Sequence, residues 1–147
     1  MMIANRHAQV VWEGTLAGGA GTASGGSGAF ELPVTWAART ERPDGKTSPE
    51  ELIAAAHASC FAMALALVLG ENHVAPERLT VTAICTLDEV DGAPRITASE
   101  LTVLARAPSL DKPGLERSVA AAAELCPVSN ALRGNVEITV RDDVDEG

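Results

Sequence analysis

Hydrophobic and polar positions form two clear patterns in the chain, one alternating segment and one long apolar run. Residues 79–87 alternate strictly: one face carries threonines with Ile84, and the other carries Val81, Ala83, Cys85 and Leu87. A period of two predicts a β-strand with one face toward a core. Residues 52–69 are apolar at almost every position, so they predict a helix that is buried on most of its sides.

The start of this helix is strongly marked in the sequence. Ser48 suits the N-cap, Pro49 suits the first helical position, and Glu51 suits the third, where it completes a capping box. Gly70 suits the position just after the last helical residue, so we predict a helix over 49–69. One chain of 147 residues has few elements with which to surround such a helix, and we expect a partner subunit to help cover it.

Turn signals and shorter patterns place the other elements. Residues 7–16 are typical of a strand, and the glycine-rich residues 18–28 fit either a flexible loop or a second hairpin strand. Residues 39–46 form a polar loop that contains Pro43-Asp44-Gly45, a turn signal.

Beyond the alternating strand, Asp91-Gly92 predicts a hairpin turn. The further elements predicted are a strand at 96–105, a helix at 113–125, a short helix at 128–133, a strand at 136–140 and a frayed acidic tail at 142–147. This order of strands and helices, without internal repeats, indicates a single α+β domain over residues 1–147.

Composition and charge narrow the classes of function. The net charge of −9 repels phosphate backbones and anionic lipids, so we expect no nucleic-acid or membrane partner. The run 52–69 approaches transmembrane length, but it is rich in alanine and contains His57 and Ser59, which favours a buried helix of a soluble protein. Residues 1–9 lack the apolar segment of a secretory signal, and three cysteines fit a reducing cytoplasm.

Two of the three cysteines lie inside predicted secondary structure. Cys85 lies on the apolar face of its strand, the setting of a structural thiol. Cys60 lies in the apolar helix, where burial raises a thiol pKa, so a catalytic role requires a nearby cation. His57 is three residues earlier on roughly the same face and could serve, although a hydrogen-bonded core histidine is the commoner outcome.

Cys126 has a different setting, because it precedes Pro127 where a short helix begins. A thiol at a helix N-terminus meets unpaired N–H groups, which lower its pKa without a charged neighbour. An inward-packed residue at the end of a helix is an equally good interpretation. The cysteine and histidine spacings do not match a zinc site, and the three glycines of a dinucleotide loop are lacking, so we expect no metal and no cofactor.

Three segments resemble one protein family, the osmotically inducible protein C and organic hydroperoxide resistance (OsmC/Ohr) proteins, and fit its osmotically inducible branch. They are TSPEELIAAAHASCFAMAL at residues 47–65, CPVS at residues 126–129 and VWEG at residues 11–14. The resemblance implies an intertwined α+β homodimer, with a long buried central helix packed against antiparallel sheets. It also implies reduction of hydroperoxides, especially organic ones, by two cysteines without a cofactor.

The resemblance also implies roles for individual residues. Cys60 matches the cysteine that attacks the peroxide, Cys126 matches the cysteine that resolves it to a disulfide, and Glu50 matches the family glutamate. The family arginine lies outside these motifs; Arg39 is our choice, with Arg42 in reserve. An external dithiol, of lipoyl or similar type, would reopen the disulfide.

The physics of the reaction fits these roles. A guanidinium is always charged and can hold a thiolate at neutral pH, and a carboxylate can fix its orientation. Glu50 and Cys60 are ten residues apart, about 15 Å along a straight helix, so we expect Arg39 and Glu50 to act on the Cys60 of a neighbouring chain. Two other interpretations stay open: a thiol redox sensor or stress protein without sustained turnover, and a non-catalytic domain with inert thiols.

Overall fold

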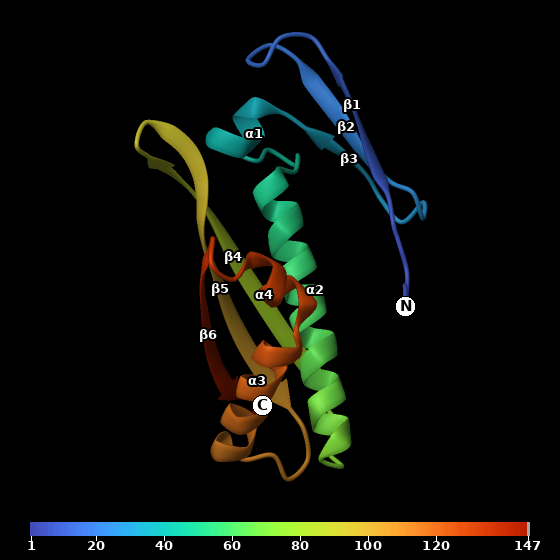
Figure 1. Ribbon diagram of the computed structural model, residues 1–147, viewed down its shortest axis with the longest axis vertical. Helices are drawn as coiled ribbons and strands as arrows, with labels where there is room; N and C mark the ends of the chain where they lie inside the picture. The colour runs from blue at the N-terminus through green and yellow to red at the C-terminus, as the bar shows by residue number, and fades with distance from the viewer. Residues whose placement is uncertain (147) are drawn as a thin grey trace. The chain divides into compact units, whose positions relative to one another are not determined.

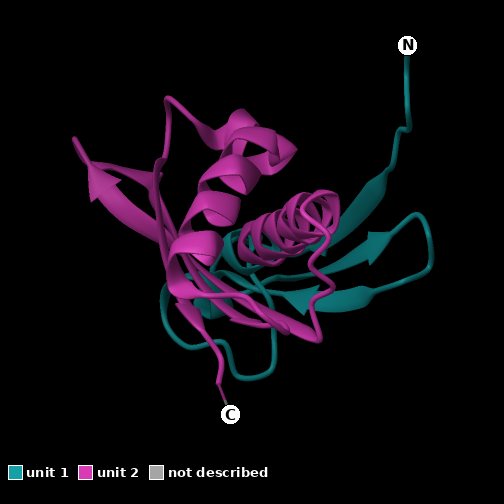
Figure 2. Cartoon of the chain, turned by 90° about the horizontal axis from the view of Figure 1, so that it is seen from below, with its two compact units in different colours: residues 1–52 teal, residues 53–147 magenta. Residues whose placement is uncertain are grey.

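The computed structural model describes residues 1–146. Contacts within the chain group it into two compact units, Met1–Leu52 and Ile53–Gly147, which Figure 2 shows in different colours. Each unit has its own three-stranded sheet. The long helix α2, Pro49–Glu71, begins in the first unit and continues into the second (Figure 1).

The sheet of the first unit is an antiparallel meander in the order β1-β2-β3. Its strands are β1 (Ala8–Glu13), β2 (Ala20–Gly25) and β3 (Glu31–Val34). The glycine-rich segment is therefore a hairpin strand and not a flexible loop. Gly21 on β2 lies against Trp12 of β1, where a Cβ atom would come within 2.9 Å of the indole ring. Glycine lets the two strands and the indole pack closely.

A short helix, α1 (Trp36–Thr40), follows the sheet in place of the first part of the predicted polar loop. Thr35 caps it, because its side chain accepts a hydrogen bond from the backbone N–H of Ala38 (3.1 Å). The sequence suggested a loop at Arg39, but Arg39 lies on this helix. The predicted turn is present at Pro43-Asp44-Gly45, where Asp44 and Gly45 both have positive φ angles.

The start of α2 differs from the prediction in one hydrogen bond. The Ser48 hydroxyl accepts from the backbone N–H of Glu51 (3.2 Å), as an N-cap should. The Glu51 carboxylate, however, accepts from the Thr47 hydroxyl (2.7 Å). The expected capping box is thus only half formed, since the threonine before the cap offers a stronger local donor.

The end of α2 lies two residues beyond the predicted one. Gly70 stays helical, and His73 adopts the left-handed conformation (φ 59°) that we expected of the glycine. The backbone N–H of Val74 donates to the Leu69 carbonyl (2.8 Å), and the Asn72 side chain donates to the Val68 carbonyl (3.0 Å). These two bonds satisfy carbonyls that the end of the helix leaves free.

The sheet of the second unit contains two long strands and a third that runs parallel to its neighbour. Strands β4 (Arg78–Val90) and β5 (Ala93–Arg106) form a hairpin through the predicted Asp91-Gly92 turn. Strand β6 (Glu137–Val144) pairs with β5 in parallel, so this sheet is mixed and not wholly antiparallel. A parallel pairing needs a crossover connection, which α3 (Lys112–Leu125) and α4 (Pro127–Leu132) supply.

The acidic tail is more ordered than the sequence suggested. Strand β6 continues to Val144, where a frayed end was predicted from residue 142. Asp142 pairs with Lys112 at the start of α3 (2.7 Å), and Asp145 pairs with Arg106 of β5 (3.1 Å). Tertiary ion pairs and strand pairing therefore override the polar composition of this segment. Gly147 lies outside the described residues.

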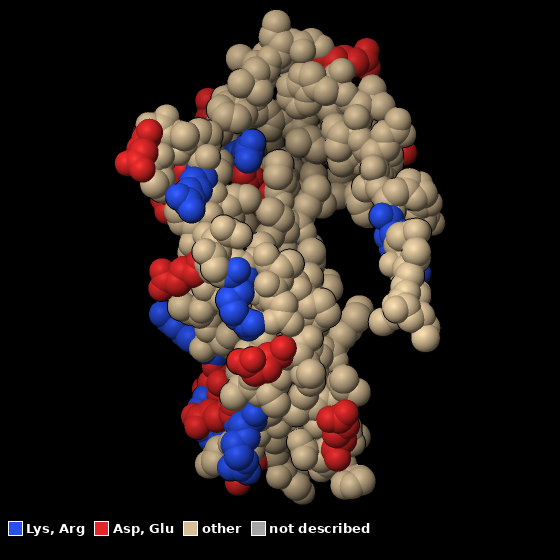
Figure 3. Space-filling model, in the orientation of Figure 1, with Lys and Arg blue, Asp and Glu red and all other residues tan. Residues whose placement is uncertain are grey.

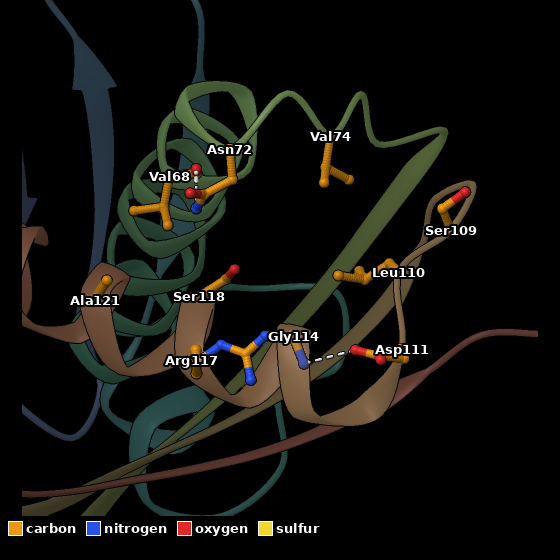
Figure 4. Close-up of a pocket in the computed structure, with 10 residues that line it drawn as sticks. All are labelled: Val68, Asn72, Val74, Ser109, Leu110, Asp111, Gly114, Arg117, Ser118 and Ala121. Atoms are coloured by element: carbon orange, nitrogen blue, oxygen red, sulfur yellow. Dashed lines mark hydrogen bonds between the residues drawn. The ribbon is translucent and has the colours of Figure 1, made fainter.

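The core of the second unit lies between its sheet and its helices. Its fully buried side chains include Phe61, Leu65 and Leu69 of α2, together with Leu101, Val103, Ala105, Leu115 and Ala122. Asp111 fixes the start of α3 by accepting from the Gly114 backbone N–H (2.8 Å), which Figure 4 shows as a dashed line between these two residues. Residues 79, 81, 83, 85 and 87 of β4 are half-buried, on the face that the alternation predicted to point inward.

One side of α2 is not covered by its own chain. Met63 is 72% exposed and Leu67 is 54% exposed, and no charged residue occurs between Glu51 and Glu71. In Figure 3 the charged side chains of the second unit lie mainly over α3, α4 and the strands, and the surface along α2 is largely free of them. By length and composition α2 could cross a membrane, but its inner side is part of the core.

Candidate functional site

Two of the three cysteines lie next to each other in the second unit. Cys60 is half-buried in the middle of α2, and Cys126 is fully buried between α3 and α4, where it is the N-cap of α4. Both thiols are free, and their side chains are hydrogen-bonded to each other. The structure therefore brings together two sulfur atoms that are 66 positions apart in the sequence.

Hydrogen bonds favour ionisation of Cys126. Burial alone would raise the pKa of the Cys126 thiol, but hydrogen bonds from the Ser129 side chain and backbone, from Cys60 and from the Val128 backbone lower it below its ordinary value. The Ser129 backbone N–H points at the sulfur from 3.5 Å. The two backbone donors, Val128 and Ser129, are the ones expected of a thiol at the start of a helix.

Cys60 has the opposite tendency within this unit. Burial raises the pKa of the Cys60 thiol, and the neighbouring Cys126 raises it further, although a hydrogen bond from the Val128 backbone acts in the other direction. An apolar helix and a second thiol offer no positive charge. Ionisation of Cys60 at neutral pH therefore requires a cation in addition to these groups.

His57 is a fully buried residue one turn before Cys60. Its Nδ1 lies 2.6 Å from the Ser99 hydroxyl on β5, and its Nε2 lies 2.7 Å from the Ser129 hydroxyl on α4. Burial lowers the pKa of the imidazole, so the ring is neutral at pH 7. His57 is thus a hydrogen-bonded core residue, one of the two possibilities that its sequence position left open.

Arg39 and Glu50 form an ion pair within the first unit. The Arg39 Nε lies 2.7 Å and 3.2 Å from the two Glu50 carboxylate oxygens. Glu50 is only 7% exposed, in the first turn of α2, whereas the Arg39 side chain is 30% exposed. The guanidinium also lies over the Trp36 ring, 6.0 Å from its centre. The carboxylate holds the guanidinium in place through Nε, and within residues 1–146 neither terminal nitrogen makes a hydrogen bond.

An apolar hollow lies beside this ion pair. Its volume is about 170 Å³, and it is lined by Trp12, Leu16, Val34, Thr35, Trp36, Arg39 and Pro49. An aromatic and aliphatic wall next to a charged donor suits a ligand with a polar head and an apolar tail. Arg42, the reserve choice for the family arginine, is exposed and makes no ion pair among residues 1–146.

A larger cavity, of about 530 Å³, lies between the end of α2 and the start of α3 (Figure 4). Arg117, Ser118 and Asn72 line it, but no cysteine or histidine does. Its size therefore does not make it the site of thiol chemistry. Cys85, the third thiol, lies half-buried on β4, as expected of a structural residue.

The sequence did not reveal every residue that contacts His57 or Arg39. Ser99 and Ser129 both bond to His57, and Trp36 packs against Arg39. Ser129 could have been found, because it is the last residue of the CPVS segment. Ser99 lies on a different strand, and only the tertiary fold places it beside the helix. Within residues 1–146, no three His, Cys, Asp or Glu side chains gather as metal ligands would.

Comparison with known proteins gives consistent results. The family model described as OsmC-like protein matches residues 42–141. The chain is 38% identical to peroxiredoxin OsmC of Escherichia coli K12 over 138 residues, which cover 93% of this chain and 96% of that protein. It is 30% identical over 122 residues to organic hydroperoxide resistance protein OhrB of Bacillus subtilis, which cover 82% and 88% of the two chains.

Solved structures show the same similarity at the level of the fold. The organic hydroperoxide resistance protein OsmC of Legionella pneumophila superposes with a TM-score of 0.78 and 26% identity. The match covers 98% of this chain and all of that one. An α+β fold with two three-stranded sheets and a long helix is thus shared with solved OsmC and Ohr structures.

Proposed function

The chain belongs to the OsmC-like protein family, and from this we propose that it is a cysteine-based peroxidase that reduces organic hydroperoxides. The names of the relatives, a peroxiredoxin and several organic hydroperoxide resistance proteins, support a peroxidase-type role. The observation that carries the proposal is the hydrogen-bonded pair of thiols, half-buried Cys60 and buried Cys126. A thiol pair can be oxidised and reduced repeatedly without a cofactor.

The first step takes place at Cys60. Its thiolate attacks one oxygen of the peroxide bond, an S–O bond forms, and the O–O bond breaks. The alkoxide that leaves takes up a proton and becomes the alcohol, while Cys60 becomes a sulfenic acid. Two electrons pass from the sulfur to the peroxide in this step.

The second step closes a disulfide. Cys126 attacks the Cys60 sulfur, an S–S bond forms, and the sulfenic oxygen leaves as water. An external dithiol, of lipoyl or similar type, then reopens the bond by thiol–disulfide exchange. We place the protein in the reducing cytoplasm, where such dithiols are kept reduced.

Arg39 and Glu50 supply what the cysteine pair lacks. Burial raises the pKa of Cys60, so a permanent positive charge is needed to keep a thiolate at neutral pH. The Arg39 guanidinium can supply that charge and donate to the peroxide oxygens, and Glu50 fixes its direction. The apolar hollow beside Arg39 would take the alkyl group of the substrate.

We infer that these groups meet the cysteines across a dimer. Ten helical residues separate Glu50 from Cys60, about 15 Å along the axis of an unbroken helix. In an antiparallel pair of α2 helices, the start of one would lie near the middle of the other. The same arrangement would cover the exposed Met63 and Leu67. Such an isologous contact is typical of a twofold homodimer.

Sustained turnover separates this proposal from a redox sensor that uses the same thiols. Purified protein is mixed with an excess of an organic hydroperoxide and an excess of a lipoyl-type dithiol, and peroxide loss is followed. A peroxidase consumes many equivalents per subunit, and consumption stops without the dithiol. Consumption that ends after one equivalent, with every dithiol tested, would favour the sensor and contradict sustained peroxidase activity.

A further inference from the structure

A line of buried hydrogen bonds connects strand β5 to the Cys126 thiol. Ser99 on β5 bonds to His57 on α2, His57 bonds to Ser129 on α4, and Ser129 bonds to the sulfur through its backbone N–H (3.5 Å) as well as its side chain. The residues Ser99, His57, Ser129 and Cys126 are all 1% exposed or less. Three different elements contribute to this line, and the proposed reaction steps do not yet use His57.

The direction of the line follows from the hydrogen-bonding capacity of each group once the Ser129 hydroxyl donates to the sulfur. A serine hydroxyl has one hydrogen, and donation from Ser129 to the Cys126 sulfur uses it. The Ser129 oxygen must then accept from His57, which requires the imidazole hydrogen on Nε2. Burial lowers the pKa of His57 and favours a neutral ring, in which Nδ1 would be bare and would accept from the Ser99 hydroxyl.

We propose that His57 is a positioning residue for the resolving thiol: held by Ser99, it aims the Ser129 hydroxyl at Cys126 and so stabilises the Cys126 thiolate. Without His57 the Ser129 hydroxyl could rotate away from the sulfur. This inference rests on the proposed role of Cys126 as the resolving thiol. It adds a function for a histidine that touches neither the peroxide nor the reacting sulfurs.

The thiolate matters in the second step of the reaction. Cys126 first loses its proton to solvent, and its thiolate then attacks the sulfur of the Cys60 sulfenic acid. The S–S bond forms as the S–O bond breaks, and the leaving hydroxide combines with a proton to give water. Because the thiolate is the nucleophile, the rate of this step at a given pH follows the ionised fraction of Cys126.

Few other titratable groups act on this thiol. Cys60 is hydrogen-bonded to it, and His57 acts through Ser129. The charged side chains on the elements packed around it, Glu100 on β5, Glu124 on α3 and Arg133 after α4, are all exposed to solvent. The pH dependence of Cys126 therefore reports mainly on Cys60 and on the hydrogen-bond line.

The test measures the pKa of Cys126 directly. In a Cys60→Ser, Cys85→Ser background Cys126 is the only thiol, and its ionisation is followed by the ultraviolet absorbance of the thiolate. His57→Phe, which keeps a ring but has no donor, should raise the Cys126 pKa by about one unit. His57→Gln can still donate to Ser129, so in this variant the Cys126 pKa should stay close to its value with His57 present.

Kinetics give a second readout in the protein with all three cysteines. At pH 6, His57→Phe should slow disulfide formation about tenfold more than it slows sulfenic acid formation at Cys60. A merely structural role would slow both steps alike and would not be rescued by glutamine. The absorbance titration needs no peroxide, so it tests the role of His57 even if Cys60 does not reduce peroxides.

A third measurement avoids substitutions altogether. The ring nitrogens of His57 in the wild-type protein, observed by ¹⁵N NMR, should show hydrogen on Nε2 and a bare Nδ1. This result remains available if His57→Phe does not fold. An unchanged Cys126 pKa in folded His57→Phe, or hydrogen on Nδ1 with a bare Nε2, would overturn the proposal.

Discussion

The two units of the chain differ in the chemistry that their side chains offer. The second unit has two adjacent thiols, but burial raises the pKa of Cys60, and no cation among residues 53–146 lowers it. The first unit has a fixed guanidinium and an apolar hollow, but residues 1–52 contain no cysteine. One region has a nucleophile without charge, and the other has charge without a nucleophile.

This difference explains why neither pattern alone predicts a function. A buried thiol on an alanine-rich helix is ordinarily inert, and a surface ion pair is ordinarily of little consequence. In the proposed reaction the two act together, because the charge would lower the pKa that burial raises. The proposed function therefore requires the two regions to meet across the dimer.

The largest effect is expected at the nucleophile of the second unit. Cys60→Ser should lower peroxide reduction by at least about 10⁴-fold, since a hydroxyl does not ionise at neutral pH. Cys85→Ser is the matched control, because Cys85 lies on β4 and should leave the rate almost unchanged. Rates are measured as peroxide loss with excess dithiol. Full loss of activity in folded Cys85→Ser would contradict the contrast between these two thiols.

Cys126→Ser should separate the two steps of the reaction. We expect about one equivalent of peroxide to be consumed per site, after which Cys60 has no thiol partner and turnover nearly stops. Under excess peroxide the Cys60 sulfenic acid should advance to sulfinic acid, which intact-mass analysis detects as added oxygen. Normal turnover with no oxygen added would exclude Cys126 as the resolving thiol.

The charge of the first unit should control the pH profile of the thiol in the second. Arg39→Ala should reduce activity at pH 7 by about 10²-fold, because the Cys60 pKa then rises with burial unopposed. The loss should shrink as the pH is raised, since more thiolate forms. Arg42→Ala is the matched control and should behave like the wild type. A loss in Arg39→Ala that is equal at every pH would rule out a role in ionising Cys60.

The hollow beside Arg39 should set the preference for the alkyl group. Trp36→Ala removes part of its wall and should weaken the use of a bulky organic hydroperoxide by about tenfold, with a much smaller effect on hydrogen peroxide. The ratio of kcat/KM values for the two substrates is the measurement. An equal effect on both would mean that Trp36 only supports Arg39.

The sequence predicted most of the elements because their signals are local. The alternation of β4, the Asp91-Gly92 turn and the Ser48-Pro49 helix start each depend on neighbouring residues, and each is present. The errors arose where distant residues decide the structure. Asp142 is held in β6 with the help of Lys112, thirty positions away, and no local pattern reveals that pairing.

At the candidate site, too, local signals were predicted and contacts between distant residues were not. Cys60 and Cys126 were singled out by their local settings and their motifs, and the fold places them in contact. The arginine was harder to choose, because α1 was not predicted and the Arg39–Glu50 pairing depends on the turn between two helices. The buried bond of His57 to Ser99 joins a helix to a strand, so only the tertiary structure could show it.

The most direct test of the central claim is complementation between two inactive subunits. One variant carries Cys60→Ser, and the other carries Arg39→Ala together with Glu50→Ala; the two are mixed under conditions that allow subunit exchange. If each site takes its cysteines from one chain and its Arg–Glu pair from the other, each mixed dimer has one complete site, and activity should return to about half the wild-type sites in that dimer. If mass analysis confirms exchange and no activity returns, each site is built within a single chain and the cross-chain account is wrong.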